Sequence, residues 1–218
     1  MESEIRILSA PSWSVFTPED AMARLRDAGH KVGPEPSPTM VFGARECAAF
    51  VATWMKNRGL ALGLSRCEIL AGSEGEYRLD VPFRPMVDLD LEVDYLGEPL
   101  SGVTLLNAQK GVLYRRDAFP CTAESEPVGL FGIMEVLGEP HPHITVRFWA
   151  GYEQGKVPNE LIQAIWITFK AWYERIPREA DTAYEQRTKT ATSYRKPQAL
   201  PEEAKEILTE YHRGFRDG

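Results

Sequence analysis

Histidines and cysteines are the side chains of this sequence best suited to metal or nucleophilic chemistry. His141 and His143 stand two positions apart in a proline-rich segment, where both could ligate zinc. A tetrahedral zinc site needs four ligands, and no second pair of Cys or His residues stands at a suitable spacing. Cys47, Cys67 and Cys121 lie 20 and 54 positions apart and form no CxxC pair. The sequence therefore predicts no bound metal ion and no other cofactor.

Catalytic motifs are also absent from the sequence. It contains no GxSxG elbow, Walker loop, HExxH helix or GxGxxG turn after a strand. Ser65 and Cys67 have no neighbouring base that their spacing would orient. The sequence predicts a protein that is not an enzyme. The alternative from another class is a small metal-dependent hydrolase that uses His141 and His143 with the loop over residues 115–143.

A row of carboxylates marks the middle of the chain. Asp88, Asp90, Glu92 and Asp94 alternate with apolar residues over positions 87–95. A calcium-binding EF-hand loop would need a glycine at its sixth position and a glutamate at its twelfth, which this segment lacks. The period of two predicts a strand with four carboxylates on one face and five apolar side chains on the other.

The same region carries most of the net charge of the chain. Residues 66–98 contain nine acids and three arginines, a net charge of -6 out of -7 for the whole chain. Two interpretations stay open: an ordinary solvated acidic face, or a channel lining that repels phosphate because it offers few cations for counterion release. Since 32 acids outnumber 25 basic residues overall, a general affinity for nucleic acids or anionic membranes is not expected.

Composition and apolar runs indicate where the protein works. The 218 residues are 43% hydrophobic and 26% charged, enough for one substantial core or two small ones. The N-terminus opens with acids and has no sustained apolar stretch, so we expect no signal peptide. The most apolar segment, residues 161–172, is too short to span a bilayer. An odd number of cysteines favours a reducing compartment, so we expect the cytosol or a particle assembled there.

Hydrophobic periodicity predicts an α+β fold, with a helical core, an inserted antiparallel β region and a C-terminal helical arm. We expect N-terminal core helices in residues 1–63, the β insertion at 64–150, a central core helix in 151–177 and the arm at 178–218. Helices are expected over 17–27, 41–58, 157–175 and 201–213, with a stiff proline-rich loop at 29–39. Strands are expected at 67–71, 78–81, 87–95, 102–106, 112–115, 133–137 and 143–149. Their short connections favour antiparallel pairing.

The helix expected over residues 157–175 is apolar around most of its circumference. Such a helix is buried centrally or shared between a core and a subunit interface. The residues expected there are Ile162, Trp166, Phe169, Trp172 and Tyr173.

The order of these segments resembles the head-tail connector (adaptor) proteins of tailed phages, including the adaptors of gene transfer agents. The resemblance runs over Val15-Phe16-Thr17-Pro18-Glu19-Asp20-Ala21, Leu79-Asp80-Val81-Pro82-Phe83-Arg84-Pro85, Val146-Arg147-Phe148-Trp149-Ala150-Gly151-Tyr152, Leu161-Ile162-Gln163-Ala164-Ile165 and Tyr211-His212-Arg213. It spans most of the chain and departs from the family pattern in the long loop at 29–39.

The resemblance implies a structural protein of a bacteriophage-like virion. Such a protein forms a ring, a homododecamer, under the portal protein, extends the DNA channel and provides the platform for the next neck or tail protein during genome packaging and ejection. Double-stranded DNA would pass without sequence-specific binding, and no membrane is involved. The protein would reside in the virion neck after assembly in the host cytoplasm. The alternative within this class is another neck component, a stopper or tail terminator.

The resemblance also assigns roles to two groups of residues. The C-terminal arm would dock on the portal, and aromatic and arginine anchors dominate such interfaces. The portal-binding residues expected are Tyr194, Arg195, Leu200, Leu208, Tyr211 and Arg213. The candidates for facing the channel are Asp88, Asp90, Glu92 and Asp94.

Overall fold

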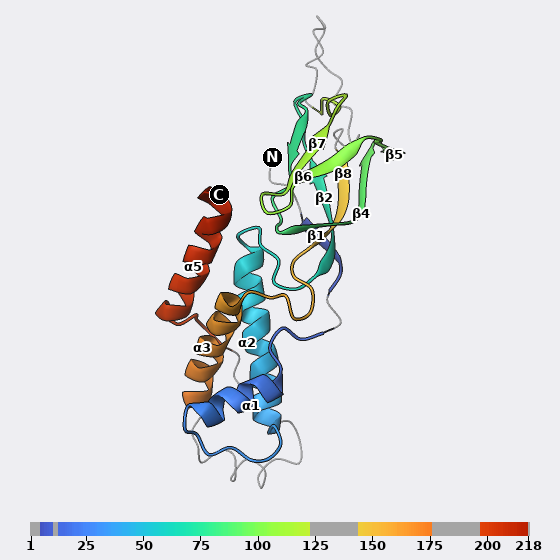
Figure 1. Cartoon of the computed structure of the whole chain (residues 1–218). Helices are drawn as coiled ribbons and strands as arrows, with labels where there is room; N and C mark the ends of the chain where they lie inside the picture. The colour runs from blue at the N-terminus through green and yellow to red at the C-terminus, as the bar shows by residue number, and fades with distance from the viewer. Residues whose placement is uncertain (1–4, 11–12, 123–143, 176–196, 218) are drawn as a thin grey trace, which may run out of the picture. The chain divides into compact units, whose positions relative to one another are not determined.

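A computed structural model of the chain describes residues 5–10, 13–122, 144–175 and 197–217. The chain divides into two compact units (Figure 1). The sheet unit comprises Met1–Ala10 and Leu64–Gly151, and the helical unit comprises Pro11–Gly63 and Tyr152–Gly218. Among the described residues, four helices and two antiparallel sheets make up these units, which confirms the α+β class. No helix in the described ranges is long and apolar enough to cross a membrane.

The helical unit contains α1 (Pro18–Asp27), α2 (Pro38–Lys56), α3 (Asn159–Glu174) and α5 (Glu202–Asp217). Thr17 caps α1 by a reciprocal capping box with Asp20. Ser37 accepts a hydrogen bond from the Met40 amide and starts α2 three residues earlier than the apolar pattern indicates. The proline-rich loop therefore ends at Ser37, because Pro38 suits the first turn of a helix.

The core of the helical unit is built around aromatic rings of α3. Phe169 is fully buried, and its ring centroid lies 5.8 Å from that of Phe16 and 5.9 Å from that of Trp172. Gly43 of α2 sits against the same indole: a Cβ at this glycine would lie 2.0 Å from the Trp172 ring. Only a residue without a side chain allows α2 to approach α3 so closely.

The sheet unit holds a five-stranded sheet of order β1-β2-β8-β4-β5 and a three-stranded sheet of order β3-β7-β6. The strands of the first are β1 (Ile5–Ser9), β2 (Ser65–Ala71), β8 (Ile144–Ala150), β4 (Met86–Tyr95) and β5 (Glu98–Pro99). Those of the second are β3 (Arg78–Asp80), β7 (Val112–Arg115) and β6 (Val103–Asn107). All strand pairs are antiparallel, as predicted, although only β4–β5 and β6–β7 are joined by the short connections on which that prediction rests.

One face of the five-stranded sheet forms the core of its unit. Ile144, Val146, Phe148 and Ala150 of β8 are fully buried, while the residues between them are half-buried on the opposite face. Cys67 and Ile69 of the neighbouring strand β2 are fully buried as well. This alternation is the period-2 pattern that the sequence shows over the same strand.

Three boundaries differ from those that the sequence indicates. Residues 5–9, grouped above with the N-terminal helices, form β1 and pair with β2 across about sixty residues of chain. Gly214 does not end the last helix, which continues to Asp217. The strand expected over 87–95 is followed by a further strand that the sequence did not predict, because β5 pairs back on β4. The strand expected at 133–137 lies outside the described residues.

Candidate interaction surfaces

The described part of the chain does not bring the His and Cys side chains singled out above into a catalytic arrangement. No three of its His, Cys, Asp or Glu residues are grouped as metal ligands would be. His141 and His143 lie outside the described residues, so the structure does not place them. Burial, followed by the charge of Glu46, raises the pKa of Cys47 to about 12. This thiol therefore stays protonated near neutral pH and packs as a small apolar side chain.

The acidic row of β4 does not form one continuous face. The pairing of β4 with β8 shifts register between Val87 and Glu92, and Asp90 has a left-handed φ of 46°. A bulge of this kind breaks the alternation, so Leu89 is exposed at 46%, whereas Met86 and Val93 of the same strand are buried. The prediction of a regular two-faced strand is therefore wrong between these positions. Asp88 and Asp90 stand on the bulge, apart from the last two acids.

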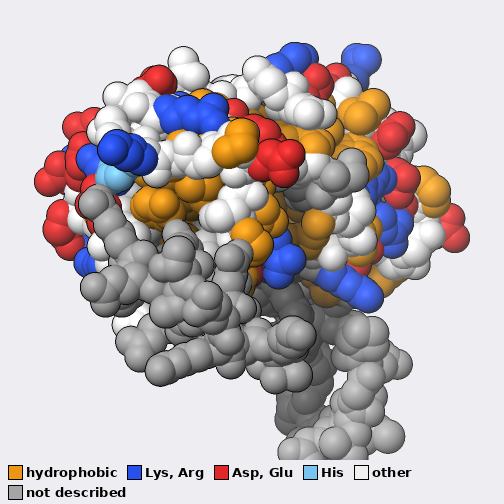
Figure 2. Space-filling view, turned by 90° about the horizontal axis from the view of Figure 1, so that it is seen from below, with side chains coloured by type: hydrophobic (Ala, Val, Ile, Leu, Met, Phe, Trp, Pro, Cys, Tyr) orange, Lys and Arg blue, Asp and Glu red, His pale blue; other side chains and the backbone are white. Residues whose placement is uncertain are grey.

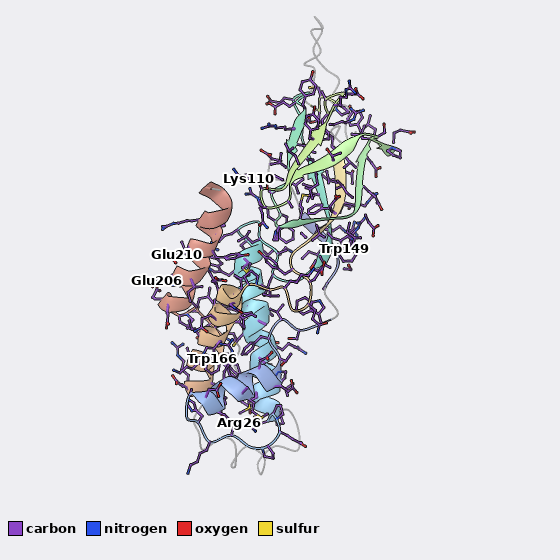
Figure 3. All side chains as sticks on the ribbon, in the orientation of Figure 1. Arg26, Lys110, Trp149, Trp166, Glu206 and Glu210 are labelled. Atoms are coloured by element: carbon purple, nitrogen blue, oxygen red, sulfur yellow. The ribbon has the colours of Figure 1, made fainter. Side chains whose placement is uncertain are left out.

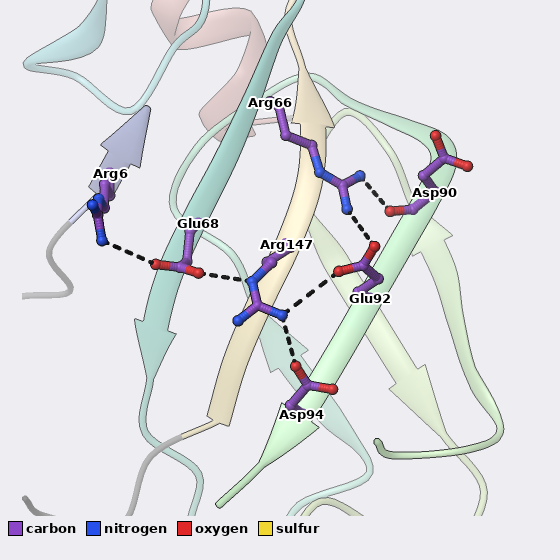
Figure 4. Close-up of polar contacts among 7 residues, drawn as sticks. All are labelled: Arg6, Arg66, Glu68, Asp90, Glu92, Asp94 and Arg147. Atoms are coloured by element: carbon purple, nitrogen blue, oxygen red, sulfur yellow. Dashed lines mark hydrogen bonds and ion pairs between the residues drawn. The ribbon is translucent and has the colours of Figure 1, made fainter. Parts of the chain in front are cut away.

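The two remaining acids, Glu92 and Asp94, belong to a charge network across the outer face of the five-stranded sheet (Figure 4). We call this the charge ladder: Arg6 of β1, Arg66 and Glu68 of β2, Arg147 of β8, and Glu92 and Asp94 of β4.

Arg147 is the centre of the charge ladder. Its Nε donates to Glu68 Oε2 at 2.7 Å, and one terminal nitrogen donates to Asp94 Oδ2 at 2.9 Å and lies 3.6 Å from Glu92. The hydrogen bond to Glu68 raises the pKa of Arg147 above its ordinary value; desolvation opposes this, and the charges of Glu68, Asp94 and Glu92 add to it. Because the fork holds carboxylates on both neighbouring strands, it ties β2, β8 and β4 together.

The charge ladder changes the electrostatic interpretation of this region. Its three arginines balance its three carboxylates, and Arg66 also pairs with Glu92 at 2.9 Å. Glu92 and Asp94 are thus compensated within the unit, and the uncompensated part of the row is Asp88 and Asp90, both exposed. A surface that repels phosphate would depend on those two carboxylates. The sequence did not single out Arg147. The available signal was its place between the apolar residues Val146 and Phe148 of a predicted strand, which puts it on the opposite face from them.

The apolar residues of α3 lie in the core of their own unit. Trp166, Phe169 and Trp172 are buried, so they pack within this unit. Ile162 and Tyr173 are partly buried at the edge of the same cluster. Of the five residues expected in a core or a subunit interface, these two are the ones that reach the surface.

The terminal helix α5 is not a free arm. Leu200 and Leu208 are buried against the helical core, with Ala204 between them. The same amphipathic pattern that would fit a portal groove is satisfied here by α3, so a portal contact of these two leucines would require α5 to leave the core. Arg213 is exposed, and Tyr194 and Arg195 lie outside the described residues.

Tyr211 holds α5 in place through a polar contact. Its hydroxyl forms a hydrogen bond with that of Tyr152, which follows the sheet unit in the chain. Burial, and then the charge of Glu160, raises the pKa of Tyr152 to about 12. Tyr211 is therefore half-buried and engaged within the unit, although the sequence indicated a portal contact.

The surface of the helical unit also has a hollow at the start of α2. It measures about 470 Å³ and is lined by Pro36, Pro38, Val41, Phe42 and Arg45. Val41 is 49% exposed. Figure 2 shows the molecule from below, with hydrophobic side chains reaching the surface among charged ones. The hollow is a second candidate contact surface, and the sequence analysis took its residues only as loop and helix.

Comparison with known proteins identifies the fold. No family model and no curated protein matches the sequence. The structure is similar to a chain in the neck of an empty gene transfer agent particle computed with C6 symmetry, at 12% identity and a TM-score of 0.59 over 94% of each chain. It is also similar to a chain in the virion of the native gene transfer agent particle, at 15% identity and a TM-score of 0.53 over 95% of this chain and 94% of that one. For the fold, these likenesses confirm the resemblance to neck proteins of phage-like particles that the sequence indicates.

Proposed function

We propose that this protein is a structural component of the neck of a phage-like particle, and that it acts there as the head-tail connector, or adaptor. The observation that carries the proposal is the fold match over 94% of both chains to a chain whose structure is that of a particle neck. A match of that extent includes both the sheet unit and the helical unit. Fold alone does not fix function, so the assignment to the neck has to be tested on the particle.

A neck adaptor works as a ring, and several features support self-association here. The similar neck structure was computed with C6 symmetry, which describes a ring arrangement of that particle. Closed rings are built from head-to-tail interfaces, in which two different surfaces of the same chain meet. The proposed assembly is a ring of this protein, expected to be twelve-fold, that continues the channel below the portal.

The proposed contact with the portal lies in the C-terminal part of the chain. Since Leu200 and Leu208 hold α5 in the helical core, the residues proposed for this contact are Tyr194, Arg195 and the exposed Arg213. The exposed Asp88 and Asp90 are the candidates for facing passing DNA. Their carboxylates would repel the DNA phosphates. Without a cation at these positions, DNA would release no counterions there and would gain no affinity.

A reconstruction of the particle tests the proposal directly. We expect density for this fold in a ring between the portal and the tail. Particles made without the protein should accumulate as DNA-filled heads that lack tails. Absence of the protein from purified particles contradicts the proposal.

A binding assay separates the adaptor from other neck components. We expect the purified protein to be captured by portal protein, and Arg213→Glu to weaken capture at least tenfold. Lys156→Glu makes the same charge change at an exposed loop residue and should bind as the wild type does. Capture by tail proteins without capture by portal would instead identify a stopper or tail terminator.

A further inference from the structure

The outward face of α2 offers a surface that none of the described residues of its own unit covers. Arg45, Ala49 and Lys56 are exposed and lie on the side of the helix opposite buried Cys47 and Val51. The hollow described above opens at the N-terminal end of this face and includes Arg45 in its lining. We call this surface the α2 face. Its N-terminal end combines the apolar lining of the hollow with the charge of Arg45, and its C-terminal end carries the charge of Lys56.

Positive charge on the α2 face is only weakly neutralised. The side chain of Arg45 is 81% exposed, and its one ion pair in the described structure is with the adjacent Glu46, at 3.4 Å. Lys56 forms no ion pair with any residue that the structure describes. A partner for this face should accordingly carry carboxylates at helical spacing.

Helix α5 presents such carboxylates. Glu203, Glu206 and Glu210 are all exposed, and Figure 3 labels the last two. Their spacing of three and four residues places them on one side of the helix, away from buried Ala204 and Leu208. None of the three forms an ion pair within the described part of the chain. We call them the α5 acidic face.

The two faces lie on opposite sides of the helical unit. Helix α3 contacts both α2 and α5, and each of these helices turns its buried residues toward the core that they share with α3. Their outward faces therefore point away from each other and cannot meet within one copy. Two complementary surfaces on opposite sides of one unit have the geometry of a head-to-tail interface.

We propose that the α2 face of one copy is covered by the α5 acidic face of the next copy, and that this contact joins neighbouring subunits. The inference rests on the proposed ring and identifies the surfaces that build it. Arg45 and Lys56 of one subunit would face Glu206 and Glu210 of its neighbour. Exposed ion pairs contribute little affinity one at a time, so their role is to select the partner and set the register, while the apolar hollow is desolvated.

Charge reversal tests the contact. The α2-reversed variant carries Arg45→Glu and Lys56→Glu, and the α5-reversed variant carries Glu206→Lys and Glu210→Lys. All four side chains are exposed, so both variants should fold with wild-type circular dichroism and melting temperature. By light scattering after gel filtration at low ionic strength, we expect wild type to form oligomers and each variant to fall to the mass of a monomer.

Restoration distinguishes a direct contact from a general charge effect. In a mixture of the two variants, each faces a neighbour of opposite charge, so the oligomer should return at the wild-type mass. The same should hold for one chain that carries all four substitutions. The control variant, Glu76→Lys with Glu98→Lys, makes the same charge change as the α5-reversed variant at two exposed positions of the sheet unit and should assemble normally.

Three results would overturn the inference: a wild type that is monomeric at every concentration, reversed variants that assemble normally, or charge swaps that fail to restore assembly. These results are separable from the proposed function, which depends on where the protein lies in the particle. A protein found in the neck whose reversed variants still assemble keeps its function and loses only this interface.

Discussion

The two units of this protein are held together in different ways. The helical unit is built around Phe169, which packs among four other aromatic rings. The five-stranded sheet also has an apolar core on one face. On its other face, the guanidinium of Arg147 pairs with carboxylates of both neighbouring strands. Apolar packing has no charges for salt to screen, whereas partly exposed ion pairs are screened. Removal of one side chain should therefore lower the free energy of unfolding by a different amount, and with a different dependence on salt, in the two units.

The largest effect is expected from Phe169→Ala. Phe169 is fully buried at the centre of the aromatic cluster, so its removal leaves a cavity and should lower the free energy of unfolding by roughly 3 to 5 kcal/mol. Urea denaturation followed by tryptophan fluorescence measures this loss, which should be equal at low and high salt. Lys170→Ala changes the neighbouring residue of α3, whose side chain is 45% exposed, and should change stability by less than about 0.5 kcal/mol. A loss that shrinks strongly in salt would contradict a purely apolar core.

Gly43→Ala should have the next largest effect, and its sign is unusual. Replacing glycine by alanine inside a helix normally stabilises it by roughly 0.5 to 1 kcal/mol. Here the added Cβ would lie 2.0 Å from the Trp172 ring, so we expect a net loss of about 1 to 3 kcal/mol from overpacking.

A matched control for Gly43 exists in α5. Gly214 also lies within a helix, and a Cβ there would meet nothing within 4 Å. Gly214→Ala should raise the melting temperature, whereas Gly43→Ala should lower it. Two shifts of the same sign would show that helix propensity, and not the contact with Trp172, decides the outcome.

Removing Arg147 tests the charge ladder. Arg147→Met keeps much of the side-chain length and leaves Asp94 without a described partner, while Glu68 keeps only Arg6 at 4.0 Å. Because the side chain of Arg147 is 36% exposed, we expect a loss of about 1 kcal/mol at low salt, falling by half or more in 1 M salt. Urea unfolding of the variant and the wild type at two salt concentrations measures this loss.

A single exposed ion pair serves as the comparison for the ladder. Lys156 and Glu153 lie 2.7 Å apart, with side chains 70% and 50% exposed. Lys156→Met should change stability by no more than about 0.5 kcal/mol at any salt concentration. If it costs as much as Arg147→Met, then the cross-strand network adds nothing beyond one ordinary ion pair.

Local patterns predicted the regular elements of both units. Thr17 with Pro18 marks the start of α1, and alternation over residues 144–150 marks β8, because caps and side-chain periods are properties of short segments. The bulge at Asp90 escaped this reasoning, since an inserted residue shows only when the partner strand is known. For the same reason β1 was missed, as its partner β2 lies about sixty residues away.

The interaction surfaces were harder to predict than the elements. The apolar side of α5 fits either a partner's groove or the unit's own α3, and the sequence pattern is the same in both cases. In the structure of the single chain, Leu208 is buried in the core that α5 shares with α3. Likewise, the charge of Asp94 was visible in the sequence, but its compensation by Arg147 depends on the register of β4 against β8. Sequence thus located the charged region and could not say which charges remain free.

A polar contact within the apolar helical unit tests whether burial there also governs titration. Tyr152→Phe removes the hydrogen bond to Tyr211 and should cost about 0.5 to 1.5 kcal/mol at pH 8. The pKa of Tyr152 is raised from 10.0 to about 12, so the stability linked to its protonated form is fully present below pH 10 and is lost as pH rises toward 12. The variant lacks this titration, and its deficit relative to wild type should shrink over that range. Urea unfolding at pH 8 and pH 11 measures both deficits, and equal deficits would mean that Tyr152 titrates alike in the folded and unfolded chains.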